Sequence, residues 1–215
     1  MAASLSSSPG SGVRLEVVGS APAEAAVHTA HRPVAPVALP AAALPATVRP
    51  LRRLAQPEGM LQVHTAPFRG SVAAVLSLAL RSAGLGSRVL VSQLLKGGVE
   101  QGLAASPWLC GRLQWLRPAV ATCLAEPAPT HGGEILEAVQ EVWAFSRQQL
   151  LHGSVDLMVL DELGLAVELG YLPLQEVLTT LELRPPHLDV ILTGPSMAPE
   201  LMALADQVTQ LRRGC

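Results

Sequence analysis

From Gly59 onward, short apolar runs alternate with longer segments of helical character, and this alternation restricts the possible folds more than any other feature. The apolar runs cover Met60–Thr65, Arg88–Ser92, Asp156–Leu160 and Leu188–Thr193. Runs of this length suit strands that are buried on both faces of a sheet. Parallel strands need long crossover connections, which are usually helices. The alternation therefore predicts βαβ units in a three-layer α/β domain with a mainly parallel sheet.

The segments between these runs carry the signals of helices that pack on a sheet. Ser71–Ala83 is apolar almost all round, and Glu134–Leu151 has one apolar stripe and is followed by Gly153. A further helix begins at Pro173, where proline suits the first helical position, and ends before Pro185-Pro186. The remaining predicted elements are strands over Leu113–Leu116 and Val208–Leu211 and a helix that follows Gly194 and reaches about Ala205.

Residues 1–58 differ in composition from the rest of the chain. Prolines interrupt an Ala/Val-rich background there, and no helical or alternating pattern follows, apart from one short strand candidate at Val13–Val18. Each proline removes a backbone donor and disfavours helix in the preceding residue. We therefore expect residues 1–58 to form a poorly ordered or loosely docked arm, and residues 59–215 to form the α/β domain.

Composition and charge argue against several classes of protein. The formal net charge is −2, so the basic stripe typical of nucleic-acid binding is not expected. No run of about 18 apolar residues is free of charge and proline, so no membrane span is expected. Cys110, Cys123 and Cys215 are far apart, which argues against a zinc site or a disulfide framework. The N-terminus lacks the cationic start and apolar core of a signal peptide, and we expect a cytoplasmic protein.

Ligands of parallel α/β domains bind at the carboxyl ends of the strands, so the turns that follow the strands hold the candidate site. The first turn spans residues 65–73 and lies between a strand and a helix, where a phosphate-binding loop would lie. Such a loop needs glycines, a lysine for the outer phosphates and a hydroxyl for magnesium. Only Gly70 fits this pattern, because Ser71 stands in place of the lysine and Val72 in place of the hydroxyl.

The second turn carries two carboxylates. Leu157–Leu160 is followed directly by Asp161 and Glu162, the arrangement in which the first carboxylate holds a magnesium shell and the second orients or polarises a reactant. A solvated acidic turn is the alternative interpretation. The third turn offers Thr193 and Gly194 at another strand end.

Several blocks of the chain resemble the ATP:corrinoid adenosyltransferase family in order and spacing. They extend over about residues 60–98 and 134–213. The blocks are Ala83-Gly84, Gln93–Gly97, Asp156–Glu162, Tyr171–Leu174, Arg184-Pro185, Val190–Gly194, Leu204–Asp206 and Leu211-Arg212.

The resemblance implies a RecA-like P-loop fold and a protein that is commonly dimeric. The family transfers the 5′-deoxyadenosyl group of ATP to the cobalt of a reduced corrinoid, cob(I)alamin, and releases triphosphate. ATP, magnesium and a corrinoid are the implied ligands. The implied nucleotide contacts are Thr65, Arg69, Gly70, Ser71 and Lys96, the implied magnesium ligands are Asp161 and Glu162, and Thr193 and Gly194 form the third turn at the same edge.

The chain departs from the family at this loop, whose family pattern is approximately T-G-N-G-K-G-K-T-T. Ala66 and Phe68 replace glycines, and Arg69 replaces the first lysine. Ser71 replaces the second lysine, and Val72 and Ala73 replace the two threonines. The Pro-rich segment Cys123–Gly133 also does not match.

Three hypotheses follow. The favoured one is a family member with lost or altered adenosyl transfer that retains a binding role for a nucleotide or a corrinoid. The second is an active transferase that uses Arg69, Asp161 and Glu162 in a modified site. The third is a non-catalytic interaction subunit that uses residues 1–58 as a tether. The altered loop argues against the second, whereas nothing in the sequence separates the first from the third.

Overall fold

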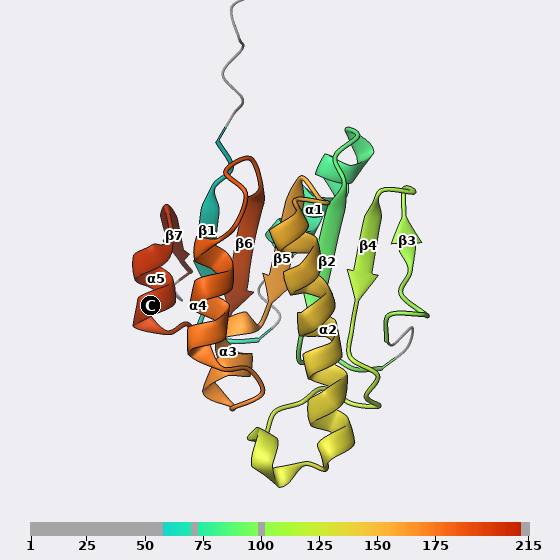
Figure 1. Ribbon diagram of the computed structural model, residues 1–215, viewed down its shortest axis with the longest axis vertical. Coiled ribbons are helices and arrows are strands. Elements are labelled where there is room, and N and C mark those ends of the chain that lie inside the picture. Colours follow the sequence, from blue (N-terminus) through green and yellow to red (C-terminus); the bar gives the residue numbers. More distant parts are fainter. Residues whose placement is uncertain (1–57, 70–72, 99–101, 212–215) are drawn as a thin grey trace, which may run out of the picture. The chain divides into compact units, whose positions relative to one another are not determined.

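The computed structural model describes residues 58–69, 73–98 and 102–211, and these form a seven-stranded sheet with helices on both faces (Figure 1). The strand order is β3-β4-β2-β5-β6-β1-β7. All neighbouring pairs are parallel except β3 and β4, so the predicted α/β class with a mainly parallel sheet is confirmed. The strands are β1 (Leu61–Thr65), β2 (Val89–Gln93), β3 (Trp108–Leu109), β4 (Leu113–Leu116), β5 (Leu157–Asp161), β6 (Asp189–Gly194) and β7 (Gln207–Gln210).

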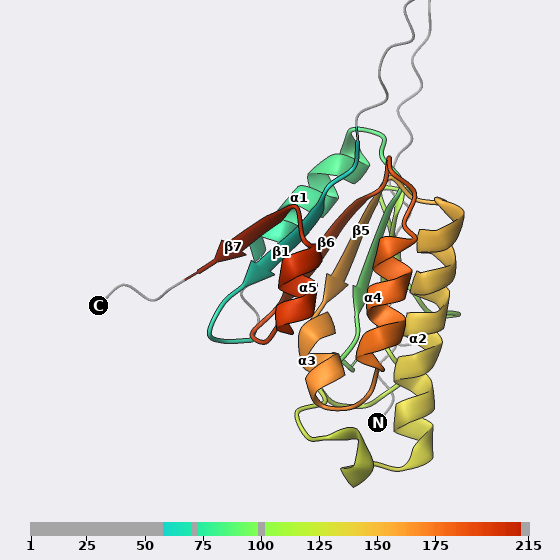
Figure 2. The ribbon, with the colours of Figure 1, turned by 60° about the vertical axis from the view of Figure 1, so that its left-hand side comes forward.

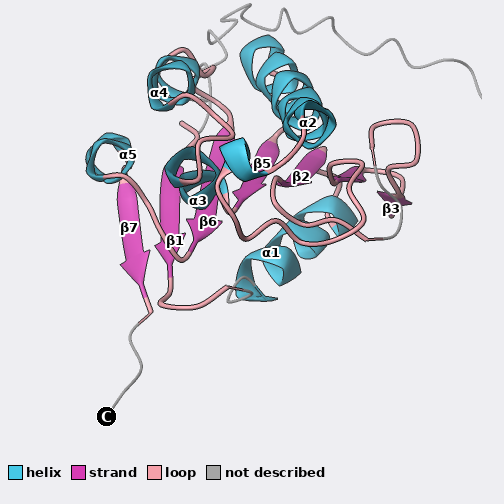
Figure 3. Cartoon of the chain, turned by 90° about the horizontal axis from the view of Figure 1, so that it is seen from below, coloured by secondary structure: helices cyan, strands magenta, loops and turns pink. Residues whose placement is uncertain are grey.

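The helices form two layers on opposite faces of the sheet. Helix α1 lies on one face, and α2, α3, α4 and α5 lie on the other (Figure 3). Two buried apolar clusters match these layers: one contains α1 and the strand residues that face it, and the other contains the remaining helices. The helices are α1 (Ala73–Gly84), α2 (Gly133–His152), α3 (Leu163–Glu168), α4 (Leu174–Glu182) and α5 (Pro199–Leu204), with a 3₁₀ turn η1 at Ala128–Thr130.

The central strands are buried along their whole length. All five residues of β2 and all five of β5 are buried, as expected for parallel strands that helices cover on both faces. The register aligns their last residues, because Gln93 pairs with Asp161 and Asp161 pairs with Thr193. These polar strand ends therefore meet at one edge of the sheet, the lower edge in Figure 1.

Helix α2 begins one residue before its predicted start at Glu134 and ends one residue after Leu151. Gly153 ends it in the left-handed conformation at φ 60°, which glycine adopts without steric cost. Seen from the side, α2 and α4 run along the same face of the sheet (Figure 2).

Besides the 3₁₀ turn η1, two elements were not predicted. Strand β3 pairs antiparallel with β4 at the edge of the sheet, and its two residues are too few to show an alternating pattern. Helix α3 follows directly after Glu162, where the sequence predicts only an acidic turn. Its six residues carry no recognisable cap, because Glu162 starts the helix from a left-handed conformation.

Some predictions fall outside the described residues. These are the strand at Val13–Val18 and the arm over residues 1–58, of which only Glu58 is described, together with Gly70, Ser71 and Val72 of the first turn. Within the described parts of the chain, none of the helices combines the length and the apolar character that a membrane crossing requires.

Candidate functional site at the carboxyl edge of the sheet

Asp161 lies at the end of β5 with only 1% of its surface exposed. Its Oδ1 accepts a hydrogen bond from Thr193 Oγ1 at 2.7 Å. Its Oδ2 accepts two, from Gln93 Nε2 at 2.8 Å and from Lys96 Nζ at 2.7 Å. A buried carboxylate is costly unless it is paired and hydrogen-bonded, and residues from β2, β6 and the turn after β2 meet both needs here.

Gln93 is held in one orientation by its neighbours. Its Oε1 accepts hydrogen bonds from Trp115 Nε1 at 2.8 Å and from Arg117 Nε at 2.9 Å. The Arg117 guanidinium also lies 5.7 Å from the centre of a Trp115 ring, within the range of cation–π attraction. With Oε1 occupied by two donors, the amide nitrogen must face Asp161, so Gln93 positions that carboxylate.

Glu162 is also buried, with 1% of its surface exposed, and its backbone is left-handed at φ 62°. Non-glycine residues adopt this conformation at a cost, and it is concentrated at functional sites. The Glu162 N–H donates to the Thr193 carbonyl at 2.8 Å. Gly194 permits this close approach, because a Cβ at that position would lie 3.2 Å from Glu162 Cα.

Arg69, in the turn after β1, forms a two-pronged pair with Glu162. Its Nε donates to Glu162 Oε1 at 2.6 Å and its Nη2 to Oε2 at 2.5 Å. Its Nη1 donates to the carbonyl of Leu124 at 2.8 Å. The hydrogen bonds to Glu162 raise the pKa of Arg69 above its ordinary value, against the opposing effect of burial. Bidentate arginine–carboxylate pairs are among the stronger polar interactions in proteins.

The Pro-rich segment after β4 packs against this edge. The Leu124 N–H donates to the Leu95 carbonyl at 2.8 Å, and its own carbonyl receives Arg69. The hydroxyl of Tyr171 donates to the Glu126 carbonyl at 3.1 Å. The segment therefore supports both Arg69 and the turn that carries Lys96.

The structure brings most of the predicted site residues together. Arg69, Lys96, Asp161, Glu162 and Thr193 are linked by direct hydrogen bonds. Thr65 ends β1 opposite Gly194 in the parallel register, so both lie at the same edge. Gly70 and Ser71 lie outside the described residues. The binding roles assigned to all of these residues stay predictions.

Gln93 and Arg117 were missed as site residues, and the hydrogen bond from Trp115 to Gln93 was not predicted. Gln93 lies in the block Gln93–Gly97 that resembles the family, but no chemical role was predicted for its side chain. A signal was available, since Gln93 is a polar residue at the end of an otherwise apolar strand, the same position that Asp161 has in β5.

The fit of a magnesium ion depends on the charges and donors that already surround the two carboxylates. Among the described residues, each oxygen of Asp161 and Glu162 already accepts a hydrogen bond, and each carboxylate is paired with a cation, Lys96 or Arg69. In this arrangement the pair does not fit magnesium, because each carboxylate is already neutralised and a divalent ion would be repelled by the two adjacent cations.

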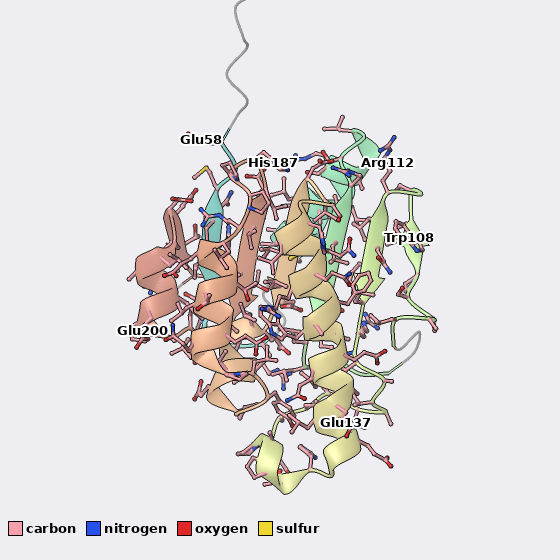
Figure 4. All side chains as sticks on the ribbon, viewed as in Figure 1. Glu58, Trp108, Arg112, Glu137, His187 and Glu200 are labelled. Carbon is pink, nitrogen blue, oxygen red and sulfur yellow. The ribbon has the colours of Figure 1, made fainter. Side chains whose placement is uncertain are left out.

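A cavity of about 510 Å³ lies elsewhere, and Arg88, Trp108, Cys110 and Arg112 are among the residues that line it. Figure 4 shows Arg112 and Trp108 beside the β3–β4 hairpin, with Arg112 at the upper edge of the sheet. The carboxylate pair lies at the opposite edge, so this cavity is not part of the candidate site.

Comparison with known proteins identifies one family. The sequence model of ATP:corrinoid adenosyltransferase BtuR/CobO/CobP matches residues 57–214. The chain is 32% identical over 160 residues to a corrinoid adenosyltransferase of Escherichia coli K12, covering 72% of this chain and 76% of that protein. It is equally similar to the corrinoid adenosyltransferase CobA of Salmonella typhimurium, with 32% identity over the same shares of the two chains. A Pseudomonas aeruginosa corrinoid adenosyltransferase is 29% identical over 163 residues, covering 71% of this chain and 74% of that protein.

Proposed function

This chain belongs to the ATP:corrinoid adenosyltransferase family, and we propose that it binds a nucleoside triphosphate at the carboxyl edge of the sheet while adenosyl transfer to a corrinoid is lost or altered. The observation that carries the proposal is the pairing of Arg69 with Glu162 and of Lys96 with Asp161. These contacts keep two cations at the strand ends, where ligands of such domains bind.

The remaining exposure of the two cations supports an anionic ligand. The side chain of Arg69 is 32% exposed and that of Lys96 is 21% exposed, whereas the carboxylates beneath them are 1% exposed. A ligand that reaches this edge therefore meets the cations before the carboxylates. Arginine and lysine are the usual protein partners of phosphate groups, which favours a polyphosphate over an uncharged ligand.

The substitutions in the first turn support the loss or alteration of transfer. Ser71 and Val72 cannot supply the ammonium and the magnesium-binding hydroxyl that the family resemblance assigns to these positions. A charge-assisted hydrogen bond contributes about 1.5–3 kcal/mol. The loss of two such contacts would weaken leaving-group stabilisation by about 100-fold to 10,000-fold, since about 1.4 kcal/mol corresponds to a factor of ten.

An active transferase with a modified loop is the second candidate. The identity of 32% to corrinoid adenosyltransferases over 72% of this chain favours it. In that case Arg69 would provide part of the positive charge of the lysine that Ser71 replaces, and it would do so from two residues earlier in the loop.

A calorimetric titration with ATP and a corrinoid adenosylation assay test the proposal. We expect micromolar ATP binding that Lys96→Gln weakens at least tenfold, because the substitution removes a cation at the site. Arg112→Gln is the matched control, since this exposed cation lies at the opposite edge of the sheet. In the adenosylation assay we expect turnover at least 100-fold below that of the Escherichia coli relative measured in parallel.

The outcomes separate the alternatives. Turnover equal to that of the relative would refute the loss or alteration of transfer and establish the second candidate. No heat of ATP binding up to millimolar concentration would refute nucleotide binding, and titration with a corrinoid would then decide whether any ligand role remains.

A further inference from the structure

Four of the charged side chains of the candidate site form two ion pairs. Two carboxylates, Asp161 and Glu162, face two cations, Lys96 and Arg69, and the formal charges cancel. Each carboxylate is 1% exposed, and Asp161 also accepts hydrogen bonds from Gln93 and Thr193. Buried acidic side chains are neutralised either by a metal ion or by basic side chains, and here basic side chains perform that task.

We propose that Arg69 and Lys96 are permanent internal counter-ions that replace the divalent metal ion at Asp161 and Glu162, so that this site binds anions without a metal ion. The metal-independent binding of a nucleotide rests on the proposed function. The replacement of the metal ion by Arg69 and Lys96 does not rest on the proposed function, because it concerns only contacts among the protein's own side chains.

The geometry of Arg69 supports a permanent role over an occasional contact. Its guanidinium uses Nε and Nη2 on both oxygens of Glu162 and Nη1 on the Leu124 carbonyl. Three donors on two separate acceptor groups fix the plane of the guanidinium. Movement of Arg69 away from Glu162 would leave a buried carboxylate unpaired, and that is strongly unfavourable.

The hydrogen bonds of Asp161 also argue against a metal ion at this site. Magnesium requires carboxylate oxygens that can enter its coordination shell. Oδ1 of Asp161 is bound by the hydroxyl of Thr193, which is itself fully buried, and Oδ2 is shared by Gln93 and Lys96. A divalent ion at Oδ2 would have to displace Gln93 or Lys96, and it would also be repelled by the two adjacent cations.

Titration of the protein alone with Mn²⁺, followed by the loss of the electron paramagnetic resonance signal of the free ion, tests the replacement. We expect the wild-type protein to bind no Mn²⁺ below millimolar concentration at this site. Arg69→Gln removes the counter-ion of Glu162 and should create a site at least tenfold tighter than that of the wild type. Adding Glu162→Gln to this variant should abolish the new site.

Two controls keep the experiment decisive. Arg69→Lys retains the charge but loses the two-pronged geometry, and it should bind Mn²⁺ no better than the wild type. If Arg69→Gln fails to fold by circular dichroism, Lys96→Gln exposes Asp161 instead and should gain a Mn²⁺ site that is lost when Asp161→Asn is added.

Wild-type binding of Mn²⁺ at micromolar concentration that Asp161→Asn abolishes would overturn the inference. Equal Mn²⁺ affinity of the wild type and a folded counter-ion variant would also overturn it. The nucleotide part is tested by ATP titration in excess EDTA and in excess Mg²⁺, for which we expect affinities within threefold of each other. Failure of ATP to bind in either condition refutes the proposed function, whereas the Mn²⁺ titration still decides the replacement.

Discussion

Thr193→Val isolates the hydrogen bond that Thr193 donates to Asp161. Thr193 is fully buried, and its Oγ1 lies 2.7 Å from Asp161 Oδ1. Valine has nearly the same shape and favours strands as threonine does, so the substitution opens no cavity in β6. It leaves one oxygen of a buried carboxylate without its donor.

The loss of stability in Thr193→Val depends on the charge of the acceptor, the Asp161 carboxylate. A hydrogen bond to a charged group contributes about 1.5–3 kcal/mol, and we expect Thr193→Val to lower the free energy of unfolding by that amount. For a domain of this size, 1 kcal/mol corresponds to about 2–4 °C in the unfolding temperature. Scanning calorimetry should therefore show a decrease of about 3–12 °C, with a parallel loss in urea unfolding.

Thr180→Val is the matched control. Thr180 is 2% exposed, and its hydroxyl donates at 2.7 Å to the Glu176 carbonyl, an uncharged acceptor within α4. Arg147 donates to the same hydroxyl at 3.2 Å, but its side chain is 48% exposed, so water can replace the lost acceptor. We expect a cost below about 1 kcal/mol. If Thr193→Val costs no more than Thr180→Val, the reasoning that Asp161 is a charged, buried and fully paired carboxylate is wrong.

Three further predictions concern packing, pH dependence and the support of Asp161. Gly164→Ala should lower the free energy of unfolding by about 1–3 kcal/mol, because its Cβ would lie 2.2 Å from a backbone oxygen, whereas Gly84→Ala, whose Cβ meets nothing within 4 Å, should be neutral or stabilising in the same thermal scans. The hydrogen bonds from Arg88 lower the pKa of Asp156 below its ordinary 3.8. Urea unfolding should therefore show the wild type to be more stable than Asp156→Asn by about 0.5–1 kcal/mol above about pH 4, as expected for such an exposed pair. This difference should disappear as the pH falls through the pKa that Asp156 has in the folded protein. A difference that persists at pH 2 would contradict this assignment. Gln93→Leu should lower the free energy of unfolding by about 1–3 kcal/mol, because it leaves partners of its amide without hydrogen bonds; an unchanged midpoint in urea would show that the amide does not hold the network.

The strands at the centre of the sheet were predictable from sequence because burial on both faces produces continuous apolar runs. Predicted Asp156–Leu160 and observed β5, Leu157–Asp161, differ by one residue at each end. The difference matters for the site, since Asp161 is the last residue of the strand and not the first of a turn. Its backbone pairs with Thr193, and this brings the two side chains within hydrogen-bonding distance.

Strand β3 at the edge of the sheet and the short helix α3 were harder to predict from the sequence. Trp108–Leu109 forms β3 only because β4 lies beside it, and two residues leave no period to detect. Helix α3 depends on the left-handed backbone of Glu162. No local signal predicts this conformation for a glutamate, because it is maintained by tertiary contacts, among them the close approach of Gly194.

The sequence by itself determined the α/β class, the family resemblance and the positions of Asp161, Glu162 and Thr193 at strand ends, since periodicity and local motifs report burial and connection order. Only the tertiary structure decided which charges pair. Arg69 and Glu162 are 93 residues apart in the chain, and Lys96 and Asp161 are 65 apart. Such pairs form when parallel strands bring distant turns to one edge, and their energy depends on burial, which is a property of the folded chain and not of any local segment.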